Sequence, residues 1–136
     1  MSQKSCFFVD YGTSQNGGKG TLQKSETKIR VEVYLPKRHV SPYRETLAWL
    51  IDELTAMRGG CSVHENVAGY YQSAKTGFDE DRICLVYSDF DMDWSEPAER
   101  AEALEYCATL KQFLKENLWE EEELLISAYA VSHVSY

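Results

Sequence analysis

Residues 28–36 alternate strictly between apolar and polar side chains, and this pattern constrains the fold more than any other feature of the chain. Every second position holds an aliphatic side chain, namely Ile29, Val31, Val33 and Leu35. Successive side chains of a β-strand point to opposite faces, so a period of two predicts a strand with one apolar and one polar face. We therefore expect a sheet that is covered on one side and open on the other, with any functional site on the open side.

Two segments are predicted to be helices. The first starts at Ser41-Pro42, a helix cap followed by proline at the first helical position, and runs to about Arg58, where Gly59-Gly60 ends it. The second starts at Ser95-Glu96-Pro97 and fades near Asn117. Apolar residues at spacings of three and four mark the face that each helix should bury. They are Tyr43, Leu47, Leu50, Leu54 and Met57 in the first helix, and Ala103, Cys107, Leu110, Leu114 and Leu118 in the second.

Three further strands complete the predicted sheet. Residues 61–64 form one strand, which continues irregularly towards Tyr71. Residues 82–87 are nearly all apolar, which is typical of a central strand, and residues 124–134 form the last strand. The polar segment 73–81 contains a glycine and is expected to be a hairpin loop.

The resulting order β-α-β-β-α-β over residues 28–136 resembles the ferredoxin-like, or α/β-plait, fold. The resemblance implies an α+β domain with an antiparallel sheet of strand order 4-1-3-2 and two helices on one face. Residues 1–27 would be an N-terminal extension that forms either a hairpin or a flexible arm. Enzymes, regulators and binding modules all use this fold, so the function must be argued from the site.

Charge and cysteine usage narrow the classes of partner. The net charge of −8 argues against nucleic acid or an anionic membrane, because both are bound by clustered Lys and Arg. The sequence has no apolar run of about 18 residues for a membrane span, and the apolar patch Cys6–Val9 is too short for the core of a signal peptide. The four cysteines include no closely spaced pair, so we expect reduced thiols in a cytoplasmic protein.

No motif predicts a cofactor, a metal or RNA. The glycine-rich segment 12–21 departs from the phosphate-binding P-loop because an extra glycine stands on each side of Lys19. The segment Asp89–Asp93 lacks the glycine and glutamate that a calcium-binding EF-hand needs, and we expect a solvated loop there before the second helix. The three histidines lack the spacing of zinc ligands. Segment 82–87 lacks the basic and aromatic signature of an RNA-recognition strand. We therefore expect no bound cofactor or metal and no nucleic-acid partner.

The remaining candidate site residues lie on the open face of the predicted sheet. Glu32 and His133 are the candidate catalytic residues, because a carboxylate can orient a histidine for acid–base chemistry near neutral pH. The candidate ligand-binding residues are polar or aromatic: Arg30, Tyr34, His64, Tyr70, Tyr71 and Tyr129. Residues of these types also form cross-strand pairs on a solvated sheet, or the polar rim of a dimer whose open faces pack together, and we weight that structural interpretation more heavily.

Three hypotheses of function are compatible with this face. The first is a non-enzymatic binding or assembly module, a homodimer whose open face forms the interface or a pocket for a small molecule. The second is a small enzyme of the dimeric α+β-barrel type, with Glu32 as the base or as the partner of His133. The third is an adaptor whose acidic surface binds a basic protein.

Overall fold

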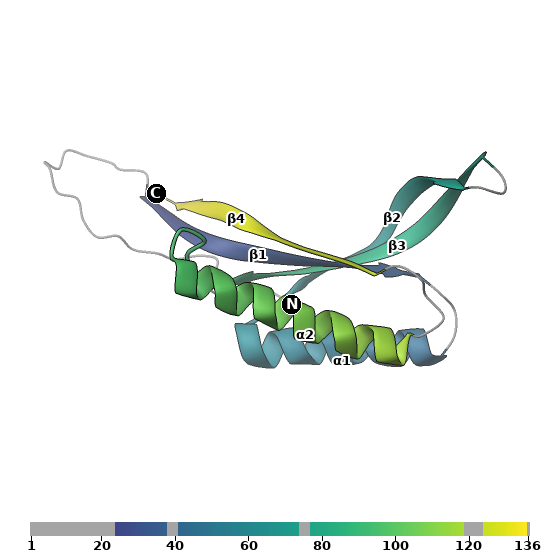
Figure 1. Ribbon diagram of the computed structural model, residues 1–136, viewed down its shortest axis with the longest axis horizontal. Coiled ribbons are helices and arrows are strands. Elements are labelled where there is room, and N and C mark those ends of the chain that lie inside the picture. Colours follow the sequence, from purple (N-terminus) through teal and green to yellow (C-terminus); the bar gives the residue numbers. More distant parts are fainter. Residues whose placement is uncertain (1–23, 38–40, 74–76, 119–123, 136) are drawn as a thin grey trace, which may run out of the picture.

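The computed structural model describes residues 24–37, 41–73, 77–118 and 124–135. Figure 1 shows a sheet with two helices on one of its faces. The elements in chain order are β1 (Lys24–Pro36), α1 (Ser41–Arg58), β2 (Ser62–Ser73), β3 (Gly77–Phe90), α2 (Pro97–Asn117) and β4 (Leu125–Ser135). The predicted α+β class is confirmed, and both helices lie where the sequence predicted them.

The four strands of the described residues form one antiparallel sheet of order β2-β3-β1-β4. β1 is therefore a central strand, with β3 on one side and β4 on the other. The predicted antiparallel contact between the first and the last strand is confirmed, with Glu32 opposite Ser127 and Arg30 opposite Tyr129. This position makes β1 the strand around which the open face is organised.

The hydrophobic core lies between the helices and the apolar face of the sheet. The period of two in β1 predicted four buried aliphatic side chains, and all four are completely buried. α1 contributes the buried Leu50 and Leu54, and α2 contributes Leu110 and Leu114. The buried Ser88 of β3 is satisfied by donating a hydrogen bond of 2.7 Å from its Oγ to the carbonyl oxygen of a glycine after α1. The core thus uses the apolar face of β1 and leaves the polar face uncovered by helices.

β1, β2 and β3 are longer than the sequence pattern predicted. β1 begins at Lys24 instead of residue 28, and β3 ends at Phe90 instead of Tyr87. The predicted hairpin loop over residues 73–81 is wrong, because β2 extends to Ser73 and β3 begins at Gly77. Residues 77–81 pair with residues 69–73 across the two strands, and polar composition alone does not distinguish such a ladder from a loop. Figure 1 shows this hairpin extending beyond the helices and rising on the side away from them.

The last turn of α1 also differs from its predicted pattern. Met57 was expected to be buried, but it is 60% exposed. Its place towards the sheet is taken by Arg58, whose guanidinium carbon lies 4.3 Å from the ring centroid of Phe90 and 4.5 Å from that of Tyr106. A long cationic side chain can cover apolar surface with its stem and stack its planar head on aromatic rings.

Several expectations fall outside the described residues. One is the predicted N-terminal hairpin or flexible arm, of which residues 1–23 are not described. The apolar patch Cys6–Val9 and the glycine-rich segment 12–21 belong to the same part of the chain. Among the helices that are described, none is both long and apolar enough to cross a membrane.

Candidate functional site

The open face of the sheet is the surface opposite the helices, and alternate residues of each strand contribute to it. On β1 these are Arg30, Glu32 and Tyr34, the polar residues between the buried aliphatic positions. Residues that lie directly opposite each other in an antiparallel pair project to the same face. Arg30 pairs with Asp89 of β3 and with Tyr129 of β4. The period of two in the sequence thus brings side chains from three strands together.

Glu32 is held between two tyrosines. The Tyr34 hydroxyl donates to Glu32 Oε1 at 2.8 Å, and the Tyr129 hydroxyl donates to Glu32 Oε2 at 2.5 Å. The hydrogen bond to Glu32, together with burial and the charge of that carboxylate, raises the pKa of Tyr34 to about 12. The same causes raise the pKa of Tyr129 above its usual value. Both phenols therefore stay protonated at neutral pH, and each oxygen of Glu32 already accepts a hydrogen bond, which disfavours Glu32 as a general base.

Asp89 of β3 joins three strands of this face, because it contacts side chains of β1 and β4. Its carboxylate accepts a bidentate pair of hydrogen bonds from Arg30, at 2.7 Å from Nε and 2.9 Å from Nη2. His133 Nε2 of β4 lies 2.7 Å from Asp89 Oδ2. Asp89 is only 3% exposed. Burial alone would raise the pKa of Asp89, but the hydrogen bonds and charge of Arg30, with a smaller contribution from His133, outweigh burial and lower that pKa below its usual value. The group is therefore a buried carboxylate with matched partners, the arrangement in which a buried charge is tolerated.

The ring of Tyr87 links this group to the edge strand β2. The guanidinium carbon of Arg30 lies 4.3 Å from the centroid of the Tyr87 ring, within cation–π range. On the other side, the imidazole of His64 stacks on Tyr87 with 5.8 Å between ring centroids and 15° between ring planes. Aromatic and planar groups therefore cover the middle of the open face from β1 to β2.

The polar network continues towards the start of β1 through Lys28. This residue is 1% exposed, and its Nζ lies 3.1 Å from Asp91 Oδ1 and 3.2 Å from Glu26 Oε2. Within this network, Glu26 Oε1 and His133 Nδ1 are buried and have no hydrogen-bond partner among the described residues. The second ring nitrogen of His133 is therefore shielded from solvent, and acid–base chemistry by His133 would require this nitrogen to become accessible.

The two predicted catalytic residues are not brought together. Glu32 bonds to tyrosines, and His133 lies against Asp89. Glu32 pairs with Ser127, six residues before His133 on β4, which corresponds to about 20 Å of extended strand. The predicted Glu32–His133 pair is therefore not formed, and Asp89 is the carboxylate that orients His133.

The predicted ligand-binding residues divide between the faces of the sheet. Arg30, Tyr34 and Tyr129 all belong to the open face, as described above. His64 also lies there, exposed and at the edge strand. Tyr70 is 65% exposed but follows an irregularity in the β2 register and pairs with Glu80, which places it on the helix side of the sheet. The side chain of Tyr71 lies outside the described residues.

Sequence reasoning missed Asp89 and Tyr87 as members of the site. Both lie on β3. Tyr87 was the last residue of the predicted strand 82–87, whereas Asp89 was expected to lie in a loop before the second helix. The period of two in fact continues through this segment, because Val86 and Phe90 are buried and Ser88 lies between them on the same face. Extending that alternation to Phe90 would have placed Asp89 on the open face, whereas its position opposite Arg30 follows only from the register of β1 and β3.

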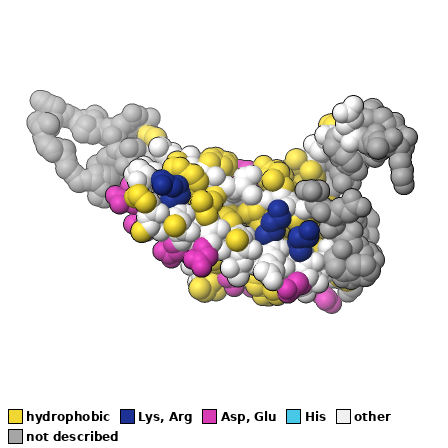
Figure 2. Space-filling view, in the orientation of Figure 1, with side chains coloured by type: hydrophobic (Ala, Val, Ile, Leu, Met, Phe, Trp, Pro, Cys, Tyr) yellow, Lys and Arg dark blue, Asp and Glu magenta, His cyan; other side chains and the backbone are white. Residues whose placement is uncertain are grey.

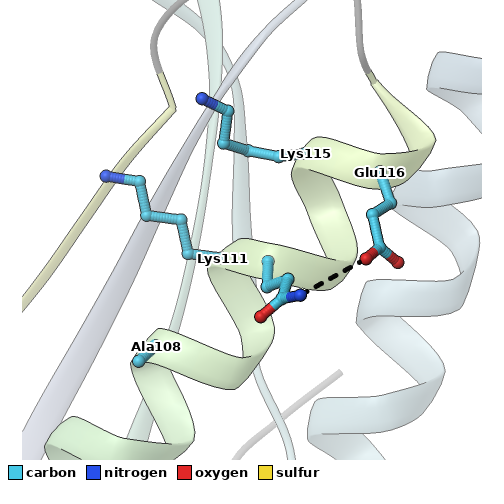
Figure 3. A pocket seen from close by; sticks show the side chains of 5 residues that line it. Ala108, Lys111, Lys115 and Glu116 are labelled. Carbon is cyan, nitrogen blue, oxygen red and sulfur yellow. Dashed lines mark hydrogen bonds between the residues drawn. The ribbon is translucent and has the colours of Figure 1, made fainter.

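The described residues line two hollows on the helices. One, of about 520 Å³, borders the exposed side of α2 and is lined by Ala108, Lys111, Gln112, Lys115 and Glu116. Figure 3 shows Lys111 and Lys115 extending from successive turns, with a hydrogen bond of 3.4 Å between Gln112 Nε2 and Glu116 Oε2. The other, of about 230 Å³, lies between the start of α1 and the end of α2, where the rings of Trp49 and Phe113 are 4.0 Å apart. Neither hollow contains the polar network of the open face.

Among the described residues, no group of three or more histidine, cysteine, aspartate or glutamate side chains is arranged to hold a metal ion. The fold and the face define an α+β domain with a four-stranded antiparallel sheet, one face of which carries an internally paired polar network. No known protein family, curated protein or solved structure matches this chain.

Proposed function

We propose that this protein is a non-enzymatic assembly module with a ferredoxin-like fold, and that it forms a homodimer through the open face of its sheet. The observation that supports this proposal is the internal pairing of the charged groups on that face. Glu32 is paired with two tyrosines, and Asp89 is paired with Arg30 and His133. A surface whose charged groups already have hydrogen-bond partners can be buried against another protein without leaving those groups unsatisfied, which is the costly outcome.

The apolar and aromatic groups of the face would supply the contact itself. Leu125 is 56% exposed and Tyr129 is 40% exposed, and the ring of Tyr87 is packed between planar side chains. Interfaces between proteins are enriched in tyrosine and arginine, and their centres are depleted of unpaired charge. A second copy would present the same paired network and the same aromatic groups, as an isologous dimer requires.

The mass of the protein in solution tests the dimer. Leu85 lies on the open face opposite Tyr34 and next to β2, so Leu85→Glu would place a new unpaired charge in the interface. We expect the wild type at micromolar concentration to be an oligomer by light scattering, and Leu85→Glu to have half the mass of the wild type or less. The matched control is Leu104→Glu, which changes an exposed leucine of α2 and should leave the dimer intact. A wild type that is a monomer at this concentration, and that has the same melting temperature as Leu85→Glu, would contradict the proposal.

The alternative is a small enzyme of the dimeric α+β-barrel type that acts on an organic substrate by acid–base chemistry. The observation that favours it is the Asp89–His133 pair, because a buried carboxylate can hold a histidine in one orientation. The histidine would act with Asp89 instead of Glu32, and Tyr34 and Tyr129 would orient the substrate. A small molecule that raises the melting temperature of the wild type but not that of His133→Asn would favour this alternative over the assembly module.

We also propose that the protein resides in the cytoplasm. Cys61, Cys84 and Cys107 are free thiols, and burial raises the pKa of each above its usual value. Protonated, buried thiols are unreactive, and free thiols are maintained in reducing compartments. Fractionation of cells that express the chain would test this location.

A further inference from the structure

β4 is an edge strand without the features that usually protect such an edge. It has 11 residues, and the sequence of the strand contains no charged residue, no proline and no glycine. Its register with β1 is unbroken from Lys24 opposite Ser135 to Tyr34 opposite Leu125. An exposed strand edge presents backbone groups that can pair with another chain, and natural proteins usually block it with charges, proline, bulges or short strands.

The opposite edge of the sheet does carry such protection. β2 contains the charged Glu65 and the flexible Gly69, and its register with β3 shifts between His64 and Val67. A bulge of this kind twists the strand and interrupts its ladder of hydrogen bonds. The two edges of the sheet therefore differ, and β4 is the edge strand that lacks features opposing the addition of a further strand.

We propose that β4 pairs in antiparallel orientation with β4 of a second copy of this chain, so that the two sheets become one. Within the part of the chain that the structure describes, β1 is the one strand that pairs with β4. Figure 1 shows β4 at the border of the sheet, and Figure 2 shows the visible Asp and Glu side chains gathered over the helices. For a chain with a net charge of −8, an uncharged strand is a place where two copies meet without opposing like charges.

The side chains of β4 are complementary to themselves when the strand is reversed. Pairing centred on Ala130, the midpoint of Leu125–Ser135, would place Ile126 opposite Val134 of the second copy and Tyr129 opposite its Val131. Val134 is 58% exposed in the single chain and would gain an aliphatic neighbour. Aromatic and β-branched residues form favourable cross-strand pairs. A ladder of this length would supply about ten backbone hydrogen bonds, as many as a whole typical interface carries.

The edge pairing uses a different surface from the open-face dimer and does not depend on it. If both interfaces form, two kinds of twofold contact combine, and the wild type should be a tetramer or a larger assembly. If the edge interface forms alone, the wild type is a dimer that Leu85→Glu leaves intact. If the open face forms alone, Leu85→Glu gives a monomer and changes in β4 have no effect. The failure of one proposal can therefore be distinguished from the failure of the other.

The decisive variant is Ala130→Lys. Ala130 is exposed at the centre of β4, so the substitution would place two lysines opposite each other across the proposed interface. We expect it to halve the mass measured by light scattering. Ala68→Lys is the matched control, because Ala68 is an exposed alanine on the protected edge strand β2, and it should leave the mass unchanged. Equal masses for Ala130→Lys and the wild type would overturn the proposal.

Amide hydrogen exchange supplies a second readout. Every second amide of an unpaired edge strand faces solvent, whereas a strand with neighbours on both sides protects all of them. We expect the β4 amides of the wild type to be protected throughout, and alternate β4 amides of Ala130→Lys to exchange rapidly. A monomeric wild type with all β4 amides protected would mean that another part of the same chain covers the edge, and it would overturn the pairing of two copies.

Discussion

At the scale of single residues, the open face shows how polar side chains that look catalytic in a sequence can satisfy one another. Glu32 was selected as a candidate catalytic residue and Tyr34 and Tyr129 as candidate ligand-binding residues, whereas Asp89 was not selected. In the structure each acid has its own donors: Glu32 accepts from Tyr34 and Tyr129, and Asp89 accepts from Arg30. A proton donor that is already bonded to a carboxylate is harder to ionise, so the pairing that stabilises the face also removes its reactivity near neutral pH.

Tyr34 offers a direct test of this pairing, because its pKa is raised from the usual 10.0 to about 12. A raised pKa in the folded state contributes stability below the unfolded value, and the contribution is lost as the pH rises through the folded value. We expect Tyr34→Phe to remove a phenolate transition near pH 12 from the ultraviolet absorbance titration, and Glu32→Gln to move that transition towards pH 10. Glu116→Gln, on the exposed side of α2, is the control. An identical titration of Glu32→Gln and the wild type would contradict the assigned hydrogen bond.

At the scale of elements, local patterns predicted most of the sheet and both helices. The cap and proline at Ser41-Pro42 and the alternation in β1 are local features, and each has a direct physical cause. The end of β3 could not be predicted in the same way. Asp89 is polar and was assigned to a loop, because its burial depends on Arg30, which is 59 residues away in the chain. A site made of cross-strand pairs requires the register, and a single sequence does not provide it.

Asp89 therefore tests what holds the end of β3 in the sheet. Its pKa is lowered from the usual 3.8, so its contribution to stability is present above that value and is lost as the pH falls through the folded value. We expect Asp89→Asn to reduce the free energy of unfolding at neutral pH by about 2–4 kcal/mol, somewhat less than for a fully buried pair because Arg30 is partly exposed.

The pH dependence of that loss separates the charge from the shape of the side chain. As the wild-type carboxyl becomes protonated at acid pH, the difference between Asp89→Asn and the wild type should shrink. Denaturant unfolding at a series of pH values measures it, with Asp52→Asn, an exposed acid on α1, as the control. A difference that stays constant down to the lowest pH would rule out the ionised pair as its cause.

At the scale of the whole molecule, the net charge of −8 acts on every association of this chain. Two copies repel each other at long range, whichever of the proposed surfaces joins them. The charge pairs of the open face lie within one chain and at short distance, so salt weakens them only slightly. The repulsion between copies acts over longer distances, and salt weakens it strongly. Self-association and binding to a basic protein should therefore respond to salt in opposite directions.

The salt dependence of the assembly follows from this repulsion. Raising the sodium chloride concentration from about 0.1 M to about 1 M shortens the screening length from about 10 Å to about 3 Å, which weakens the repulsion between copies. We expect the dissociation constant of the homo-oligomer, measured by sedimentation equilibrium, to fall several-fold over this range. An adaptor that uses its acidic surface to bind a basic partner would instead lose affinity, because salt screens the attraction between opposite charges.

The Leu104→Glu variant adds one negative charge outside both proposed interfaces. It should make the salt dependence of the dissociation constant steeper, since the repulsion that salt screens is larger. A homo-oligomer that dissociates as salt is added would show that intermolecular ion pairs hold it together, contrary to the paired open face and the uncharged β4 edge.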